Sequence, residues 1–378
     1  MTASVGKYYQ SADGLERAVV DLVRVGARGH GPGVRQLASR LMRTVPPGVD
    51  DEEAFRTAIH EALAAVGQGT ELRFTDATVP TEADSAHRLA EVDHLPNGDG
   101  LVLDEKVMDQ LQEVVAERRF RDLLHRASLS LTRTVLLSGQ PGVGKTMAAR
   151  WLAQALGWPL VTLDLSSVVS SYLGTSGRNI KAVLDYAKSG PCVLFLDEFD
   201  AIAKRRDDDT DIGELKRIVN VILVELDRWP DSSLLVAATN HPQLLDHAVG
   251  RRFDRAIELL LPGIHERRLL LHGLAVGVDD IDGRVVDLVA ELTEGTSGSD
   301  LTRLWELCRR RAILRAASTT DMLIEELARR TGDSGPGRDT LFAALSTRLN
   351  LSNRQIAAVA GVSHPTVATA IKRARARG

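Results

Sequence analysis

The sequence predicts an α/β protein: a parallel sheet with helices on both faces, flanked by helical segments at either end. Short apolar runs recur in the middle of the chain, at 134–138, 160–163, 192–196 and 234–238, with 256–260 as a candidate fifth. Stretches of helical periodicity separate these runs, and this alternation is typical of parallel strands joined by helices. After residue 263 only helical periodicity remains, so the sheet is expected to end there.

The chain is expected to divide into several folding units. Its 378 residues are too many for one compact domain. Two polar stretches that contain proline and glycine separate the regions with regular apolar spacing. We predict a helical N-terminal module over 1–70, a linker over 71–100, a large α/β domain over 101–262, a helical unit over 263–330, a second linker over 331–339 and a small, basic helical domain over 340–378.

Composition excludes several classes of protein. Hydrophobic residues make up 44% and charged residues 26% of the chain, which is ordinary for a globular protein and unlike a disordered one. The net charge of −4 argues against nucleic-acid binding by the whole surface but allows a local basic patch. With only 2 cysteines, no disulfide framework is expected and a reducing compartment fits best.

The sequence shows no feature of membrane insertion or secretion. No apolar run approaches the roughly 20 residues that span a bilayer, and residues 1–10 lack the apolar core of a signal peptide. We therefore expect a cytoplasmic location and no membrane partner.

A glycine-rich turn over 139–146, with the sequence Gly-Gln-Pro-Gly-Val-Gly-Lys-Thr, follows the first predicted strand. It matches the phosphate-binding P-loop in spacing and in context, between a strand and a helix. The glycines let backbone N–H groups turn toward phosphate oxygens, and the following helix directs its positive end to the same place. We expect Lys145 to contact the β- and γ-phosphates of ATP and Thr146 to bind Mg²⁺. The predicted nucleotide contacts in this segment are Gly139, Pro141, Gly142, Val143, Gly144, Lys145, Thr146 and Met147.

Two carboxylates, Asp197 and Glu198, come directly after the apolar run at 192–196. Parallel strands present ligands at their carboxyl ends, so both acids are expected beside the phosphates. Asp197 is the candidate Mg²⁺ ligand, and Glu198 is the candidate group that polarises the attacking water. Asp200 follows them, and its spacing suggests a helix cap.

With these motifs in place, residues 101–314 resemble the AAA subfamily of the AAA+ ATPases. The run 235–240 is similar to the sensor strand of this family, which implies that Asn240 positions the attacking water. The run 296–301 is similar to the turn that opens the adenine-side helix of the family's helical lid, which implies that 263–330 is that lid and that Gly298 lies near the nucleotide. The resemblance also implies a homo-oligomeric ring, usually a hexamer.

The segment 245–254 resembles the one that supplies arginine fingers to the neighbouring subunit of such rings. It implies that Arg251 and Arg252 neutralise charge on the γ-phosphate, an effect worth roughly 10³ to 10⁵ in rate in other systems. In the commonest form of the motif a proline and a glycine separate the two arginines, whereas here they are adjacent. The sequence therefore leaves open which of the two contributes more.

The segment 170–174, Ser-Ser-Tyr-Leu-Gly, resembles the first pore loop of threading ATPases. The resemblance implies that Tyr172 and Leu173 grip a polypeptide in the central channel, where aromatic side chains offer contact with little sequence demand. A tyrosine packed on the sheet edge is the alternative interpretation.

The last segment of the chain resembles a helix-turn-helix over 352–367. From 341 to 378 there are six Arg or Lys residues and no acid, a balance that suits contact with a phosphate backbone. The candidate DNA contacts are Ser363, His364, Thr366, Lys372 and Arg373. A small packing module or a docking site for a partner protein would give the same pattern.

The sequence as a whole predicts an ATP-hydrolysing ring that remodels or threads a protein substrate, and that serves a separately encoded peptidase or effector. The alternative is a DNA-associated ATPase recruited through the C-terminal segment. A third hypothesis, a switch that binds ATP without sustained turnover, is disfavoured by the complete catalytic set of Glu198, Asn240 and Arg251.

Overall fold

A computed structural model of the chain describes residues 79–81, 88–165, 176–201, 212–245, 247–332 and 335–377, together with Leu41, Val45 and Phe55. Apart from those three residues, the helical module predicted over 1–70 lies outside the described residues. The predicted pore-loop residues Tyr172 and Leu173 lie outside them as well.

The large domain is built on a six-stranded sheet with the order β1-β3-β4-β5-β2-β6. The strands are β1 (Glu91–Asp93), β2 (Thr134–Ser138), β3 (Leu160–Asp164), β4 (Val193–Asp197), β5 (Leu234–Thr239) and β6 (Arg255–Glu258). All neighbouring pairs are parallel except β1 with β3. The five predicted strands are confirmed, and the candidate at 256–260 corresponds to β6.

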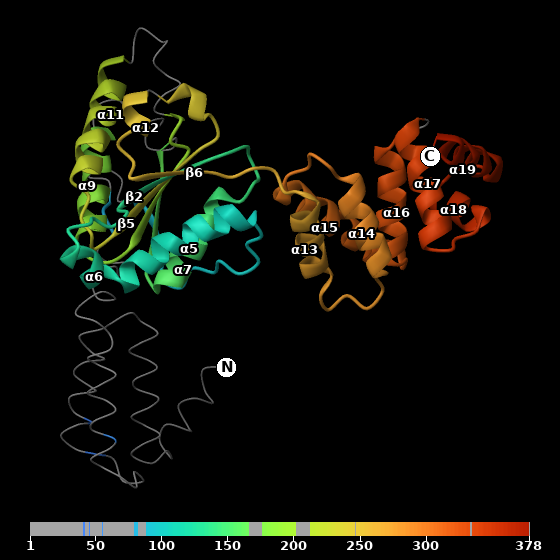
Figure 1. The fold of residues 1–378 in the computed structure, drawn as a ribbon, viewed down its shortest axis with the longest axis horizontal. Helices are drawn as coiled ribbons and strands as arrows, with labels where there is room; N and C mark the ends of the chain where they lie inside the picture. Colours follow the sequence, from blue (N-terminus) through green and yellow to red (C-terminus); the bar gives the residue numbers. More distant parts are fainter. Residues whose placement is uncertain are drawn as a thin grey trace.

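Helices cover both faces of the sheet (Figure 1). The helices of this domain are α5 (Glu105–Arg119), α6 (Arg121–Arg126), α7 (Lys145–Leu156), α9 (Ser176–Lys188), α11 (Ile212–Asp227) and α12 (His247–Gly250), with a short 3₁₀ turn at Pro242–Leu244. Helix α6 buries no residue against the sheet. Alternate residues of one strand enter different cores: Leu194 and Leu196 pack with α9 and α11, whereas Val193 and Phe195 pack with α5 and α7. This double burial explains why each central strand reads as a continuous apolar run.

Strand β1 was not predicted and lies in the segment interpreted as a linker over 71–100. Its three residues pair antiparallel with β3, with Val92 opposite Val161. The strand has three residues and only one of them is apolar, so it shows no detectable alternation of apolar and polar residues. Its partner β3 lies about 70 positions further along the chain, and the sequence pattern does not indicate that pairing.

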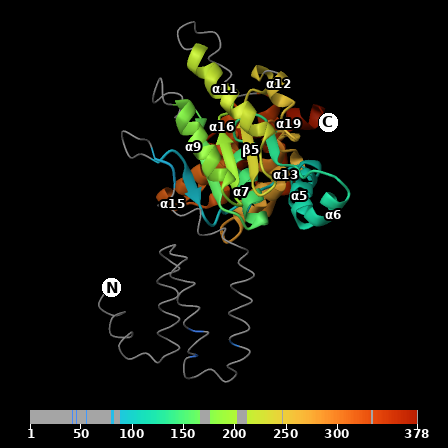
Figure 2. The same ribbon diagram turned by 90° about the vertical axis from the view of Figure 1, so that its left-hand side faces the viewer.

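Seven helices follow the sheet, and in Figure 1 they form a second group joined to β6 by the segment 259–263. In the view of Figure 2 the two groups overlap. The seven helices are α13 (Ile264–Ala275), α14 (Gly283–Leu292), α15 (Gly298–Arg315), α16 (Thr319–Arg330), α17 (Pro336–Arg348), α18 (Asn353–Ala360) and α19 (His364–Arg377). None of the helices in the described ranges is long and apolar enough to cross a bilayer.

The predicted division between a lid over 263–330, a linker over 331–339 and a separate domain over 340–378 requires correction. One hydrophobic cluster runs from Leu271 in α13 through Leu323 and Phe342 to Ile371 in α19. Helix α17 begins at Pro336, inside the predicted linker. Gly332 and Gly335 have φ values of 75° and 130°. Gly332 follows the end of α16, and Gly335 is the N-cap residue of α17. Glycines at two successive helix ends give the same sequence pattern as a linker. We name α13–α19 the lid unit.

A buried carboxylate fastens the last helix to this unit. Asp339 in α17 is 1% exposed and accepts hydrogen bonds from Arg373 at 2.8 and 3.1 Å and from Arg377 at 3.1 Å. The hydrogen bond and the charge of Arg373 lower the pKa of Asp339 below its ordinary value. The stability that the Asp339 carboxylate contributes through the two arginines is therefore fully present above pH 3.8, the ordinary pKa of the carboxyl group. This stability is lost as the pH falls through the lower pKa of the folded state.

We expect Asp339→Asn to loosen α19, because a neutral amide cannot hold two guanidinium groups in the same geometry. The expected loss is about 1–3 kcal/mol, the usual cost of losing hydrogen bonds to a charged group. Hydrogen exchange should show faster exchange of α19 amides at neutral pH, with β4 and β5 unchanged. Asp279→Asn, which alters an exposed carboxylate of the same unit, is the control. Equal protection of α19 in both variants would contradict the fastening role.

Candidate nucleotide-binding site

The glycine-rich turn lies between β2 and α7, as predicted. Gly139, Gly142 and Gly144 have φ values of 150°, 79° and 108°, a region that side chains strongly disfavour. At Gly139 a Cβ atom would also lie 2.2 Å from the carbonyl oxygen of Leu259. The turn therefore requires glycine for its backbone conformation and for its close approach to the segment after β6.

Lys145 begins α7 with its ammonium group turned into the loop. The residue is 8% exposed, and Nζ donates to the carbonyl oxygens of Gly139 at 2.8 Å and Gln140 at 3.0 Å and to Oδ1 of Asn240 at 2.6 Å. These three contacts use all the donors of the group. Burial lowers the pKa of Lys145, and the nearby carboxylate of Asp197 opposes that shift.

The acidic pair ends β4, next to β5 in the sheet. Burial raises the pKa of Asp197, while the backbone N–H of Glu198, which donates to its Oδ1 at 2.8 Å, lowers it. Glu198 is exposed and has a φ of 51°, one of four positive values among the described residues other than glycine. Such a conformation costs roughly 1–3 kcal/mol and is concentrated at functional sites.

Asn240 is brought to Lys145 by the end of β5, and Asp200 supports it from behind. Asp200 is 5% exposed, and its Oδ1 accepts from the Thr239 hydroxyl and from the Asn240 N–H, both at 3.2 Å. The sequence suggested only a helix cap for Asp200. Its role in bracing the end of β5 was missed, and the one available signal was its position two residues after Glu198, where the chain turns back over the neighbouring strand.

The lid unit contacts the glycine-rich turn directly. Helix α15 begins at Gly298 with Ser297 as its cap, and the N–H of Ser299 donates to the carbonyl oxygen of Gly142 at 3.1 Å. A Cβ atom on Gly142 would lie 2.7 Å from Oγ of Ser297. The structure therefore places the start of α15, with Gly298, beside the P-loop. Thr146 is exposed at the start of α7, and Met147 beside it is partly buried.

An open cavity of about 240 Å³ lies beside this contact. It is bounded by the segment before α5, the P-loop, the segment after β6 and the lid unit. Its lining includes Val102, Leu103, Val107, Val143, Leu259, Leu261, Leu270 and Gly298. The apolar wall contributed by residues 102–107 and 259–263 was not predicted, because those segments meet only in three dimensions.

The two candidate finger residues differ in their surroundings. Both are exposed, but Arg252 forms an ion pair with Asp227 at the end of α11, whereas Arg251 has no hydrogen bond or ion pair with any residue that the structure describes. Neither forms a hydrogen bond or ion pair with Lys145, Asp197, Glu198 or Asn240 in the part of the chain that the structure describes.

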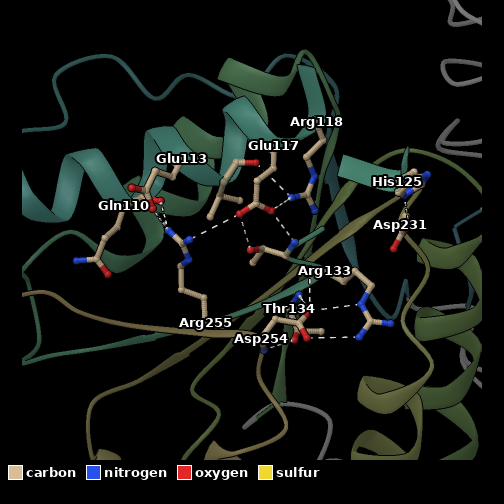
Figure 3. Close-up of polar contacts among 12 residues, drawn as sticks. Gln110, Glu113, Glu117, Arg118, His125, Arg133, Thr134, Asp231, Asp254 and Arg255 are labelled. Carbon is tan, nitrogen blue, oxygen red and sulfur yellow. Dashed lines mark hydrogen bonds and ion pairs between the residues drawn. The ribbon is translucent and has the colours of Figure 1, made fainter. Parts of the chain in front are cut away.

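The strand after the arginine pair is fixed by a polar network (Figure 3). Arg255 in β6 donates to Glu113 at 2.7 Å and forms an ion pair with Glu117 at 3.6 Å, both in α5. Asp254 accepts from the N–H of Thr134 at 3.2 Å and donates its own N–H to the Thr134 hydroxyl at 2.9 Å. The turn that carries Arg251 is therefore held firmly on its C-terminal side.

The candidate DNA contacts of the C-terminal segment lie on or beside α19. Ser363, His364, Thr366 and Lys372 are exposed. Arg373 requires a different interpretation, since its guanidinium group is bound to Asp339 within the lid unit.

Comparisons with known proteins agree with this geometry. Residues 135–261 match the family model described as the ATPase family associated with various cellular activities, AAA. An uncharacterized AAA family ATPase, y4kL, of Sinorhizobium fredii is 39% identical over 46% of this chain and 52% of its own length. The ATP-dependent zinc metalloprotease FtsH 3 of Sphaerobacter thermophilus is 34% identical over 69% of this chain and 53% of its own length. The proteasome-activating nucleotidase of Thermococcus onnurineus is 33% identical over 53% of this chain and 52% of its own length.

The chain thus spans about half the length of these curated relatives. Among solved structures, the AAA domain of FIGL-1 in complex with ADP matches with a TM-score of 0.50 and 24% identity, covering 76% of this chain and 87% of that one. That likeness concerns the fold. Together, the family match, the relatives and the P-loop geometry show that residues 135–261 are similar to an AAA ATPase domain.

Proposed function

We propose that the chain binds ATP with Mg²⁺, hydrolyses it and uses the turnover to remodel a protein substrate within a homo-oligomeric ring. The observation that carries the ATPase part is the hydrogen bond from Nζ of Lys145 to Oδ1 of Asn240 at 2.6 Å. Asn240 follows β5, whose neighbour β4 ends at Asp197, with Glu198 directly after it. Four groups with separate catalytic uses converge at the carboxyl ends of adjacent parallel strands, where α/β proteins bind their ligands.

ATP binding would change the partners of Lys145. Its ammonium group is held by two loop carbonyls and Asn240, and phosphate oxygens carry more negative charge than any of these. Moving Lys145 to the phosphates frees the Asn240 side chain to position a water molecule, while Asp200 keeps its backbone in place. The apolar cavity beside the P-loop and the lid unit suits the adenine ring.

The residues present fit Mg²⁺, which prefers oxygen ligands and retains several waters. Thr146 offers a hydroxyl, and Asp197 offers a carboxylate whose pKa is raised by burial, so a cation would offset an existing electrostatic cost. Bound there, Mg²⁺ would neutralise charge on the phosphates. Glu198, exposed at the site, would take the proton of the attacking water.

Protein remodelling is supported by two of the relatives and by the sequence of one loop. Those relatives are, by name, a proteasome-activating nucleotidase and an ATP-dependent zinc metalloprotease. The segment 170–174 carries the aromatic–aliphatic pair Tyr172 and Leu173, which would give contact with varied polypeptides. We therefore propose threading through this loop, with a separately encoded peptidase or effector as partner.

Tyr172→Ala tests the threading proposal. We expect basal ATP hydrolysis to stay near the wild-type rate, while its stimulation by an unfolded polypeptide such as casein is lost, because alanine removes the contact area that grips the chain. Phosphate release with and without casein measures both. Tyr172→Phe keeps the aromatic face and should retain stimulation. Full stimulation in the alanine variant would rule out gripping by this loop.

A further inference from the structure

The last two helices of the lid unit form a compact helix-turn-helix. Gly361, with a φ of 66°, ends α18, and the Ser363 hydroxyl accepts from the N–H of Thr366 at 3.4 Å at the start of α19. Ile356 and Val367 are both fully buried and hold the two helices together. In proteins that read DNA with this arrangement, the second helix enters the major groove.

The basic residues of this segment divide into two sets with different tasks. Three are bound by acids of the lid unit: Arg348 by Glu291, and Arg373 and Arg377 by Asp339. The other three are exposed and form no ion pair with any residue that the structure describes: Arg354, Lys372 and Arg375. We name these three the unpaired basic residues. Arg373 and Arg377 bind α19 to α17 through Asp339, and Arg348 binds α17 to α14. Lys372 and Arg375 are therefore presented on a helix that is held to the lid unit.

The outward side of α19 suits an anionic partner. Its buried residues Val367, Ala370 and Ile371 lie on one side of the helix. Thr369 and Lys372, one turn apart, are exposed on the other side. No acid occurs between 341 and 378, so no carboxylate of α18 or α19 offsets the charge of the unpaired basic residues.

We propose that α18 and α19 bind duplex DNA. Arg354, Lys372 and Arg375 would contact phosphates, and the first turn of α19, with His364, would face the base edges in the major groove. This inference is independent of protein threading and of ATP turnover. Since the shared hydrophobic core joins α19 to α15, and α15 contacts the P-loop at Gly142, the DNA surface would move with the lid.

Fluorescence anisotropy with a labelled duplex of about one helical turn, roughly 10–12 base pairs, tests the proposal on the full chain without nucleotide. Three phosphate contacts predict a salt slope of about −2.7, which corresponds to about 40-fold weaker binding at 200 mM than at 50 mM salt. In Lys372→Ala/Arg375→Ala one contact remains, so binding should be weaker and the same salt change should cost only about 3-fold.

The control is Arg309→Ala/Arg310→Ala, which removes the same charge from two exposed positions of α15 in the same lid unit. It should keep the wild-type affinity and slope. Equal loss in both double variants would reduce the effect to net charge and overturn the proposal. Binding of a single strand as tight as that of the duplex, or no duplex binding at 50 mM salt, would overturn it as well.

Discussion

Glu198→Gln is expected to lower steady-state ATP turnover by about 10²–10⁴-fold, the usual contribution of a general base, while ATP still binds. The amide has the size of the carboxyl group but cannot accept a proton at neutral pH. The backbone of Glu198 lies in the left-handed region, with a φ of 51°. Its N–H donates a hydrogen bond to Oδ1 of Asp197 at 2.8 Å. A residue held in a costly conformation at the end of β4 is better explained by a chemical task than by packing.

Two measurements separate catalysis from binding in this variant. Phosphate release should fall, while the affinity for a fluorescent ATP analogue with Mg²⁺ should stay within a few-fold of wild type. Lys145→Ala is the reference for lost binding, because it removes the group that we propose to contact the phosphates, so its affinity for the analogue should fall. Glu306→Gln, an exposed carboxylate of α15, should change neither. Wild-type turnover in Glu198→Gln would assign the base to another residue.

The sheet and the P-loop could be predicted because their signals are local. A strand buried on both faces, such as β4 with Val193 and Phe195 on one side and Leu194 and Leu196 on the other, reads as an unbroken apolar run. Gly139, Gly142 and Gly144 stand at the positions of the turn that have a positive φ. Their spacing before Lys145 therefore indicates the backbone conformation of the P-loop.

What the sequence did not predict depends on contacts between distant residues. Asp200 acts on Asn240, 40 positions away, and a lone aspartate at a helix start resembles a cap. Asp339 and Arg373 are 34 positions apart, so Arg373 read as free basic charge. Glycine and proline at 332–337 mark a helix end and a helix start, and only the shared core shows that α16 and α17 belong together.

The arginine pair gives the second large expected effect. We expect Arg251→Ala to lower ATP turnover of the assembled ring by about 10³–10⁵-fold, the range measured for arginine fingers elsewhere, and Arg252→Ala to lower it less. The reason is the difference in cis contacts: Arg252 is bound to Asp227 and anchors its turn to α11, whereas Arg251 has no partner in the described part of its own chain and so can reach a neighbour without breaking a contact.

Mixing experiments test whether the finger acts in trans. On the proposed roles, Arg251→Ala keeps an intact site and lacks the finger, whereas Glu198→Gln keeps the finger and lacks the base. Each is expected to be nearly inactive alone, and mixed rings should regain part of the activity, because Arg251 of one chain then serves the intact site of its neighbour. Mixing Glu198→Gln with Lys145→Ala should restore nothing, since neither contributes a working site.

If Arg252→Ala proved the more damaging change, the ion pair with Asp227 would have to break during the cycle. An exposed pair costs only about 0–1 kcal/mol to break, so Arg252 would then be the finger and Asp227 its resting partner.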